Sequence, residues 1–332
     1  MQRASVLLRT SFLRATVVAM LLPLLAVPRS FGWGADGHRM INRTAMQMLP
    51  AEMPAFLRTP QALNEVEYLG PEPDRWRSPA EPELSTTQAC EHFLDMELAD
   101  MVEPNGLPSY RYDFLRDVYA AEIEHPRMAE QLTPQRIGLL PWQANEVFER
   151  LKSDLRSYRT LLAAHQDTYG AEQAVLFDAG WLGHYVGDGS QPLHTTINYN
   201  GWVEADNPHG YTREHTIHSR FETEFVHNNI RQQDLAPLVP GTPRLLKMPF
   251  EDFVAYLRTS QQQVQEVYQL DKEGGFNGAG TAQSRTFVAE RLAAAASMLR
   301  DMVYTAWVQS AQPVPDWHRP ANQPSAMDAK HS

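Results

Sequence analysis

Cysteine is almost absent from this chain. Cys90 is the only cysteine among 332 residues, so no disulfide can form within the chain. Closed structural zinc sites are usually rich in cysteine thiolates, and the sequence offers no such set. We therefore expect the fold to be stabilised by side-chain packing and by metals bound through other donors.

Basic side chains are also in deficit. Lysine and arginine together number 29 against 40 aspartates and glutamates, which gives a formal net charge of −11. An acidic surface does not attract long polyanions by itself. If the substrate is a phosphate ester, the positive charge that holds it must be local, and bound metal ions would supply it.

An apolar run long enough to span a bilayer is missing as well. The apolar run at 17–27 is too short, and it follows three arginines and precedes small residues at the positions that signal peptidase reads. We predict that 1–32 is a signal peptide cleaved before Trp33. The mature protein would then be secreted or periplasmic, without a stable membrane anchor.

The sequence shows no convincing alternation of the kind that predicts strands, and no internal repeat. Apolar residues instead follow a helical period, which predicts helices at 40–49, 142–164, 171–187, 212–227, 250–270 and 284–309, and near 112–124 within a polar insert at 101–140. Prolines at alternate positions predict a loop at 71–77. The expected fold is all-α, one multi-helix domain over 33–311, followed by a disordered tail at 312–332.

Two pairs of histidine and carboxylate lie one helical turn apart. His184 and Asp188 would share a helix face, and His194, just after a helix-ending proline, can fold back towards that face. His218 and Glu222 repeat the spacing. One such pair alone would be read as a surface contact. Two pairs plus His194 favour a zinc site of nitrogen and oxygen donors.

The remaining zinc-competent residues complete a recognisable order. Trp-x4-His stands at the predicted mature start, followed by a single aspartate, by His-Phe-Leu-Asp, by His-x3-Asp-x5-His around Gln-Pro-Leu-His, and by His-x3-Glu. This order resembles the superfamily that joins zinc-dependent phospholipases C to single-strand-specific zinc nucleases. The matching positions are Trp33, His38, Asp74, His92, His184, Asp188, His194, His218 and Glu222. Beyond Glu222 the chain matches only in being helical.

The resemblance implies three zinc ions per chain, at the base of a cleft. One would take Asp74, His92, His184 and Asp188, and another His194, His218 and Glu222. The third would take His38, Asp188 as a bridge, and the α-amino nitrogen and carbonyl oxygen of Trp33. Because that amino group is free only after the leader is removed, cleavage would complete the site.

A cluster of this kind predicts hydrolysis of a phosphoric ester. Three zinc ions outweigh the charge of three carboxylates, so the cluster would bind a phosphodiester, acidify a bridging water and stabilise the leaving oxygen. Asp74 would be both a ligand and the carboxylate that orients or deprotonates the attacking water. The alternative for Asp74 is a loop-capping role.

Two features favour nucleic acid as the substrate. Arg77 follows Asp74 by three residues, where the resemblance places a basic residue on the substrate phosphate. Phe93 and Asp95 match a base pocket in which an aromatic ring stacks and a carboxylate accepts a hydrogen bond. The alternative is that Phe93 and Leu94 are core residues. The predicted substrates are single-stranded DNA or RNA and 3′-nucleotides, cleaved to 5′-phosphate products.

Other features point to phospholipid as the alternative substrate. Glu222 stands where the nucleases usually have aspartate, and the single cysteine departs from the disulfide-bearing nucleases. A third hypothesis is a zinc-stabilised binding protein without activity. None of the three implies a protein partner.

Overall fold

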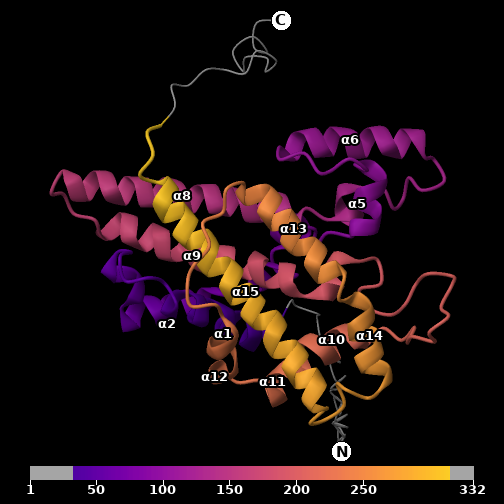
Figure 1. The fold of residues 1–332 in the computed structure, drawn as a ribbon. Helices are drawn as coiled ribbons and strands as arrows, with labels where there is room; N and C mark the ends of the chain where they lie inside the picture. The colour runs from indigo at the N-terminus through magenta and orange to yellow at the C-terminus, as the bar shows by residue number, and fades with distance from the viewer. Residues whose placement is uncertain (1–32, 315–332) are drawn as a thin grey trace, which may run out of the picture.

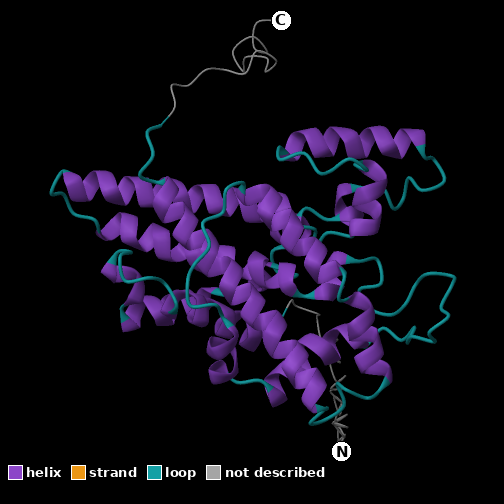
Figure 2. Ribbon diagram, viewed as in Figure 1, coloured by secondary structure: helices purple, strands orange, loops and turns teal. Residues whose placement is uncertain are grey.

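The structure is a computed structural model that describes residues 33–314. The predicted signal peptide 1–32 and the end of the predicted tail, 315–332, lie outside the described residues. In Figures 1 and 2 the regular elements of residues 33–314 are all helices, and this range contains no β-strand, only an isolated bridge between Tyr199 and Gly201. The predicted all-α class is confirmed. No helix in this range is long and apolar enough to cross a membrane.

Most helices follow one another with short connections, and the longest connection, 196–216, lies between η2 and α10. Their bounds are α1 Gly34–Gln47, η1 Ala55–Arg58, α2 Pro60–Leu69, α3 Glu72–Trp76, α4 Pro82–Ala89, α5 Met96–Val102, α6 Arg111–Glu124, α7 Pro134–Ile137, α8 Leu140–Ala163, α9 Tyr169–Ser190, η2 Pro192–Thr195, α10 Ile217–Ser219, the π-helix η3 Arg220–Glu224, α11 Phe225–Asn229, α12 Gln232–Leu235, η4 Ala236–Leu238, α13 Pro249–Gln261, α14 Val264–Lys272 and α15 Ala282–Gln309.

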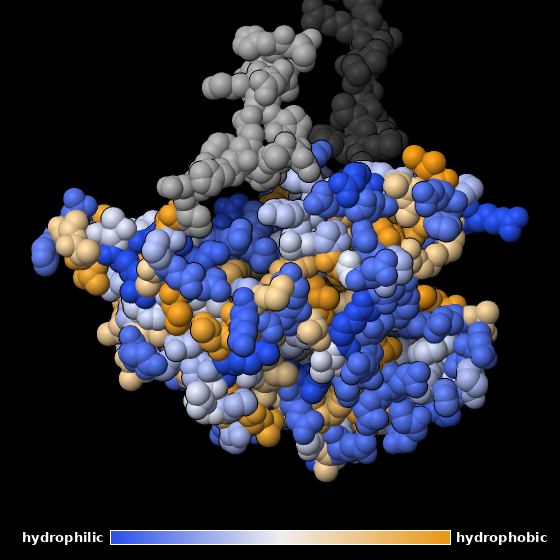
Figure 3. Space-filling model, turned by 45° about the horizontal axis from the view of Figure 1, so that its top comes forward, coloured by the Kyte–Doolittle hydropathy of each residue, from blue (hydrophilic) through white to orange (hydrophobic). Residues whose placement is uncertain are grey.

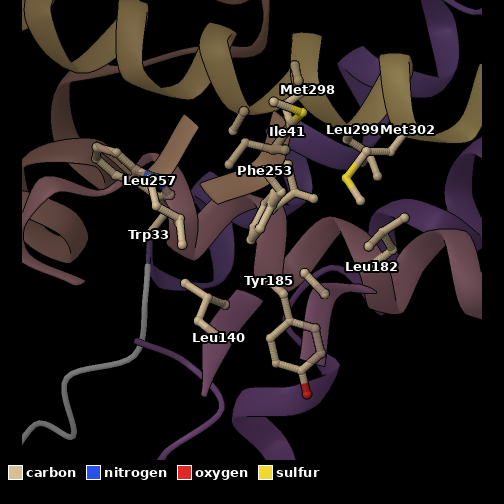
Figure 4. Close-up of a cluster of buried hydrophobic side chains, with 14 of the residues drawn as sticks. Trp33, Ile41, Leu140, Leu182, Tyr185, Phe253, Leu257, Met298, Leu299 and Met302 are labelled. Carbon is tan, nitrogen blue, oxygen red and sulfur yellow. The ribbon is translucent and has the colours of Figure 1, made fainter. Parts of the chain in front are cut away.

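The core lies around helix α9. Helices α8 and α9 pack as a hairpin, α15 crosses both, and α1 packs against α2, α9 and α15 (Figure 1). In Figure 4 Trp33, Ile41 and Leu299 appear in the same buried cluster as Tyr185 of α9 and Phe253 of α13. Apolar side chains from distant parts of the sequence therefore share one core.

Helix α1 approaches α9 closely because α9 carries glycine where the two helices touch. A Cβ atom at Gly183 would lie 1.9 Å from Asn42 Oδ1, and one at Gly187 would lie 2.8 Å from His38 Nδ1. Asn42 completes the contact by donating to the carbonyl oxygens of Val66 and Gly180 at 2.9 and 3.0 Å. The start of the described chain is thus held against the helix that carries His184 and Asp188.

Several predicted boundaries are wrong for identifiable reasons. The segment 71–77, predicted as a loop, contains the short helix α3, because Pro73 lies in the first turn, where a missing N–H costs no intrahelical bond. The predicted helix 250–270 is divided into α13 and α14. Helix α1 begins before residue 40, at Gly34, and the helix predicted from residue 212 begins only at Ile217.

The polar insert is a separate arm over the body of the molecule. Helix α6 lies at the upper right of Figure 1, and it contacts the beginning of α8 through Phe114, whose ring stacks on Trp142 with centroids 4.1 Å apart. Figure 3 shows hydrophilic and hydrophobic side chains interspersed over one face of the molecule. No single apolar patch dominates that face.

Candidate metal centre

Eight of the nine predicted ligand residues bring their side chains together. They come from α1, α3, the segment before α5, α9, η2, and the continuous helical run α10–η3–α11, and they form three groups whose ligand atoms lie within 4.8 Å of one another. The groups are His38, His184 and Asp188; Asp74, His92 and His184; and His194, His218 and Glu222. Each of these three buried groups could hold a metal ion.

The first predicted ligand set is compact. The Oδ2 atom of Asp188 lies 3.0 Å from His92 Nδ1 and 3.3 Å from His184 Nε2. The Oδ1 atom of Asp74 lies 3.8 Å from the same His92 nitrogen and 3.9 Å from the same His184 nitrogen. Asp74, His92 and His184 form one of the three possible metal groups, and Asp188 contacts both imidazoles of that group.

The second set lies where the helical run passes through the short π-helix η3. His218 Nε2 is 2.9 Å from Glu222 Oε2, and His194 Nε2 is 3.2 Å from His218 Nε2 and 3.6 Å from the same Glu222 oxygen. Gln191 donates from Nε2 to Glu222 Oε2 at 2.9 Å. Short π-helical segments within helices occur often at functional sites, and this one contains Glu222.

The third set is only partly assembled by side chains. His38 Nε2 lies 3.5 Å from Asp188 Oδ1, and its ring stacks on His184 with centroids 4.0 Å apart. Trp33 is fully buried, and its indole Nε1 donates to Ser190 Oγ at 2.7 Å. Its carbonyl oxygen accepts from the Gly37 N–H at 3.2 Å. The α-amino ligand predicted for Trp33 depends on cleavage outside the described residues.

Backbone carbonyl groups fix the orientation of three imidazoles. The Nδ1 atoms of His184, His194 and His218 lie 2.8, 2.7 and 2.9 Å from the carbonyl oxygens of Gly70, His92 and Tyr199, in that order. Because a carbonyl can only accept, each neutral ring carries its hydrogen on Nδ1 and keeps a lone pair on Nε2 for a metal. No sequence motif marks these carbonyl partners.

Buried polar atoms without hydrogen bonds concentrate at this site. Nine buried side-chain nitrogen or oxygen atoms of the described residues lack a hydrogen bond, and six belong to His38, Asp74, His92 and Asp188. Burying a polar group without a partner costs about 1–3 kcal/mol, so such a concentration needs compensation. A cation among imidazole nitrogens and carboxylate oxygens would provide it, and these donors suit zinc.

The protonation of the cluster is set by burial and by its own charges. Burial lowers the pKa of His38 to about 4 and that of His92 to about 3, and it raises the pKa of Asp74 to about 7. Burial acts against ionised Asp188 too, but His184 and His194 outweigh it and hold that pKa well below its usual range. The rings of His38 and His92 are therefore neutral near pH 7, as metal ligands must be.

A cavity of about 270 Å³ opens on the cluster. Its walls include His92, His194 and His218, the predicted substrate residues Arg77, Phe93 and Asp95, and Ala89, Gln135, Arg136, Leu193 and Tyr199. Arg77 lies on the metal side, with Nη1 3.8 Å from Asp74 Oδ1. Leu94 is fully buried, as the core alternative expected, whereas Phe93 is half-buried and faces the cavity.

The carboxyl group of Asp95 differs from the sequence expectation in its protonation. Burial, with a smaller effect of Glu97, raises its pKa to about 8. Near neutral pH the group is mostly protonated, so it can donate a hydrogen bond as well as accept one. Gln135, Arg136 and Tyr199 were missed by the sequence analysis, because they belong to the insert and to the loop after η2, where no motif marks them.

Comparisons with known proteins add little. No protein-family model matches the chain, and no curated protein matches it. A crystal structure of alpha-toxin from Clostridium perfringens, isolated from avian strain SWCP, is similar with a TM-score of 0.38 and 15% sequence identity. The match covers 83% of this chain and 65% of the toxin chain, so this chain spans about two thirds of the toxin's length.

Proposed function

We propose that this chain is an exported zinc-dependent hydrolase of phosphoric esters, related to the zinc phospholipases C and single-strand-specific zinc nucleases. The observation that supports the proposal most is the concentration of six buried polar atoms without hydrogen bonds on four of the predicted zinc ligands, next to a cavity with an arginine. A closed structural site would not be expected beside such an opening.

Three zinc ions are proposed, with the ligand sets that the resemblance implies. Zinc in such a cluster supplies the positive charge that an acidic protein lacks, and it lowers the pKa of water. The chain itself fixes the ligands: the carbonyl groups of Gly70, His92 and Tyr199 orient three imidazoles, and Gln191 orients Glu222.

The remaining roles belong to side chains of the cavity wall. Asp74 has both carboxylate oxygens without hydrogen bonds, so either can orient the attacking water and take its proton. Arg77, beside Asp74, presents a planar fork that suits a phosphate. These two residues would position the reacting phosphodiester with respect to the water.

Single-stranded nucleic acid is the substrate class we propose first, with 3′-nucleotides as smaller substrates. Phe93 and Tyr199 offer aromatic faces to the cavity, and Asp95 offers a polar group for a base edge. Stacking of bases on aromatic rings is possible only where the bases are unpaired, which favours single strands.

Phospholipid is the second candidate. Ala89, Phe93 and Leu193 make part of the cavity wall apolar, and Glu222 keeps the phospholipase form of the last ligand motif. A zinc-bound protein without activity is the third hypothesis. The open cavity beside the cluster disfavours it, because structural zinc sites are closed.

One experiment separates these candidates. The mature chain, 33–332, is analysed for bound metal and assayed on single-stranded DNA and RNA, a 3′-nucleotide and a choline phospholipid emulsion, with a chelator-treated sample and Asp74→Asn as controls. We expect zinc-dependent cleavage of the nucleic acids and the 3′-nucleotide. Cleavage of lipid alone would favour the second candidate, and no cleavage with zinc bound would favour the third.

A further inference from the structure

The cavity has two basic side chains that belong to different parts of the chain. Arg77 follows α3 and lies beside the ligand Asp74. Arg136 lies on α7, at the end of the insert, and the next residue, Ile137, accepts a hydrogen bond from the Asp95 N–H at 2.7 Å. Arg77 therefore marks the metal side of the cavity and Arg136 the side of the proposed base pocket.

The backbone around Arg136 is fixed. The N–H groups of Leu139 and Leu140 donate to the carbonyl oxygens of Cys90 and Phe93 at 2.7 and 3.2 Å, and the side chains of Leu132 and Ile137 are fully buried. The insert thus returns to the body along the segment that carries His92, Phe93 and Asp95. Arg136 is held at the rim by this contact.

The guanidinium of Arg136 is available to a ligand. Arg136 is exposed, and within residues 33–314 its side chain forms no hydrogen bond or ion pair. By contrast, Arg75, Arg111 and Arg150 each pair with a glutamate. An arginine placed on a cavity wall without a carboxylate partner is suited to a phosphate.

We propose that Arg136 binds a second phosphate of the substrate, one nucleoside away from the phosphate at the metal cluster. The inference rests on the proposed nuclease function. With phosphate contacts at Arg136 and at the metal cluster, the cavity would be specific for a nucleoside with a phosphate on each side. A strand supplies both phosphates and a 3′-mononucleotide only one. The insert is then a specificity element that favours chains over mononucleotides.

The test compares Arg136→Ala, Arg136→Lys and the wild type on a 3′-mononucleotide and on a single-stranded tetranucleotide of the same base. Arg127→Ala is the matched control, because Arg127 is exposed in the same insert but does not line the cavity. For Arg136→Ala we expect KM for the tetranucleotide to rise roughly tenfold with kcat unchanged, and KM for the mononucleotide to stay as in the wild type.

Binding gives a second readout that does not depend on turnover. The affinity of the zinc-loaded enzyme for a labelled phosphorothioate oligonucleotide is measured by anisotropy at several salt concentrations. The slope of the log binding constant against log salt should be shallower by about 0.7 in Arg136→Ala than in the wild type. Arg136→Lys should keep the slope while losing part of the affinity.

Three outcomes would overturn the inference. Equal losses on both nucleic acid substrates would show a structural role, and an unchanged tetranucleotide KM would show that Arg136 does not touch the strand. Wild-type enzyme that cleaves phospholipid but neither nucleic acid substrate would reject the proposed nuclease function together with the inference, whereas the first two outcomes leave that function intact.

Discussion

Asp178 shows how a single buried carboxyl can make stability depend on pH. It lies on α9 and is 7% exposed. Burial, followed by a hydrogen bond and a charge interaction with Asp154, raises its pKa to about 7. A carboxyl group whose pKa rises on folding contributes stability below its ordinary pKa and loses that contribution as pH rises through the folded value.

We therefore expect Asp178→Asn to gain stability relative to the wild type as pH rises from 4 to 8, since asparagine cannot ionise. Urea unfolding at both pH values measures the difference. If the difference in unfolding free energy between Asp178→Asn and the wild type is the same at pH 4 and pH 8, Asp178 does not titrate as its burial suggests.

Asp95 is the residue on which the proposed base pocket depends most. Removing its carboxyl group should take away hydrogen bonding to the base while leaving the phosphate contacts in place. We expect Asp95→Ala to reduce the difference in kcat/KM between the best and the poorest base roughly tenfold. The measurement is turnover of four homopolymeric oligonucleotides, and an unchanged base preference would remove the case for a base pocket.

At the scale of elements, Gly138 controls how the insert meets the body. Its φ is +91°, and a Cβ atom there would lie 2.1 Å from the carbonyl oxygen of Phe93. We expect Gly138→Ala to lower the free energy of unfolding by more than about 2 kcal/mol and to raise KM, because Phe93 would be displaced.

Gly106→Ala is the matched control for that change. Gly106 also has a positive φ, +118°, but no atom lies within 4 Å of the position that a Cβ would take. It should lose stability through backbone strain alone and keep the KM of the wild type. Equal effects of both variants on KM would contradict the contact argument.

The elements that the sequence predicted well are those whose signal is local. Helix α9 and the pairs His184–Asp188 and His218–Glu222 follow from helical spacing, which needs no tertiary information. Helix α3 was missed because a proline in a first turn looks the same in sequence as a proline that prevents a helix. The break after Gln261 has no glycine or proline to mark it.

At the scale of the whole molecule, spacing alone could not bring His38 and Asp74 to α9. Their place among the ligands came from the resemblance, and the structure brings these side chains within a few ångströms of His184 and Asp188. Neither residue spacing nor the family resemblance could have identified Arg136 and Tyr199 as cavity residues. They reach the cavity only because the insert and the loop after η2 fold back over it, which is a property of the complete chain.

The predicted start of the mature chain offers a test at the same scale. If the free α-amino group of Trp33 is a ligand, one extra residue before Trp33 should reduce the bound zinc from three ions to two, because an amide nitrogen does not replace an amine. Metal analysis by mass spectrometry compares that variant with a chain that begins at Trp33. Full zinc content and full activity in the extended chain would exclude the α-amino ligand.

The contact of α1 with α9 through Gly183 and Gly187 has a consequence for redesign. The separation of His38 from Asp188 depends on α1 side chains that lie directly against glycines of α9, so α9 has no side chain at these positions that could be shortened to make room. Adapting the centre to a larger cation would require an entire helix to be reseated, so we expect selection for new metals to yield changes in the α1–α2 connection before any change among the donors.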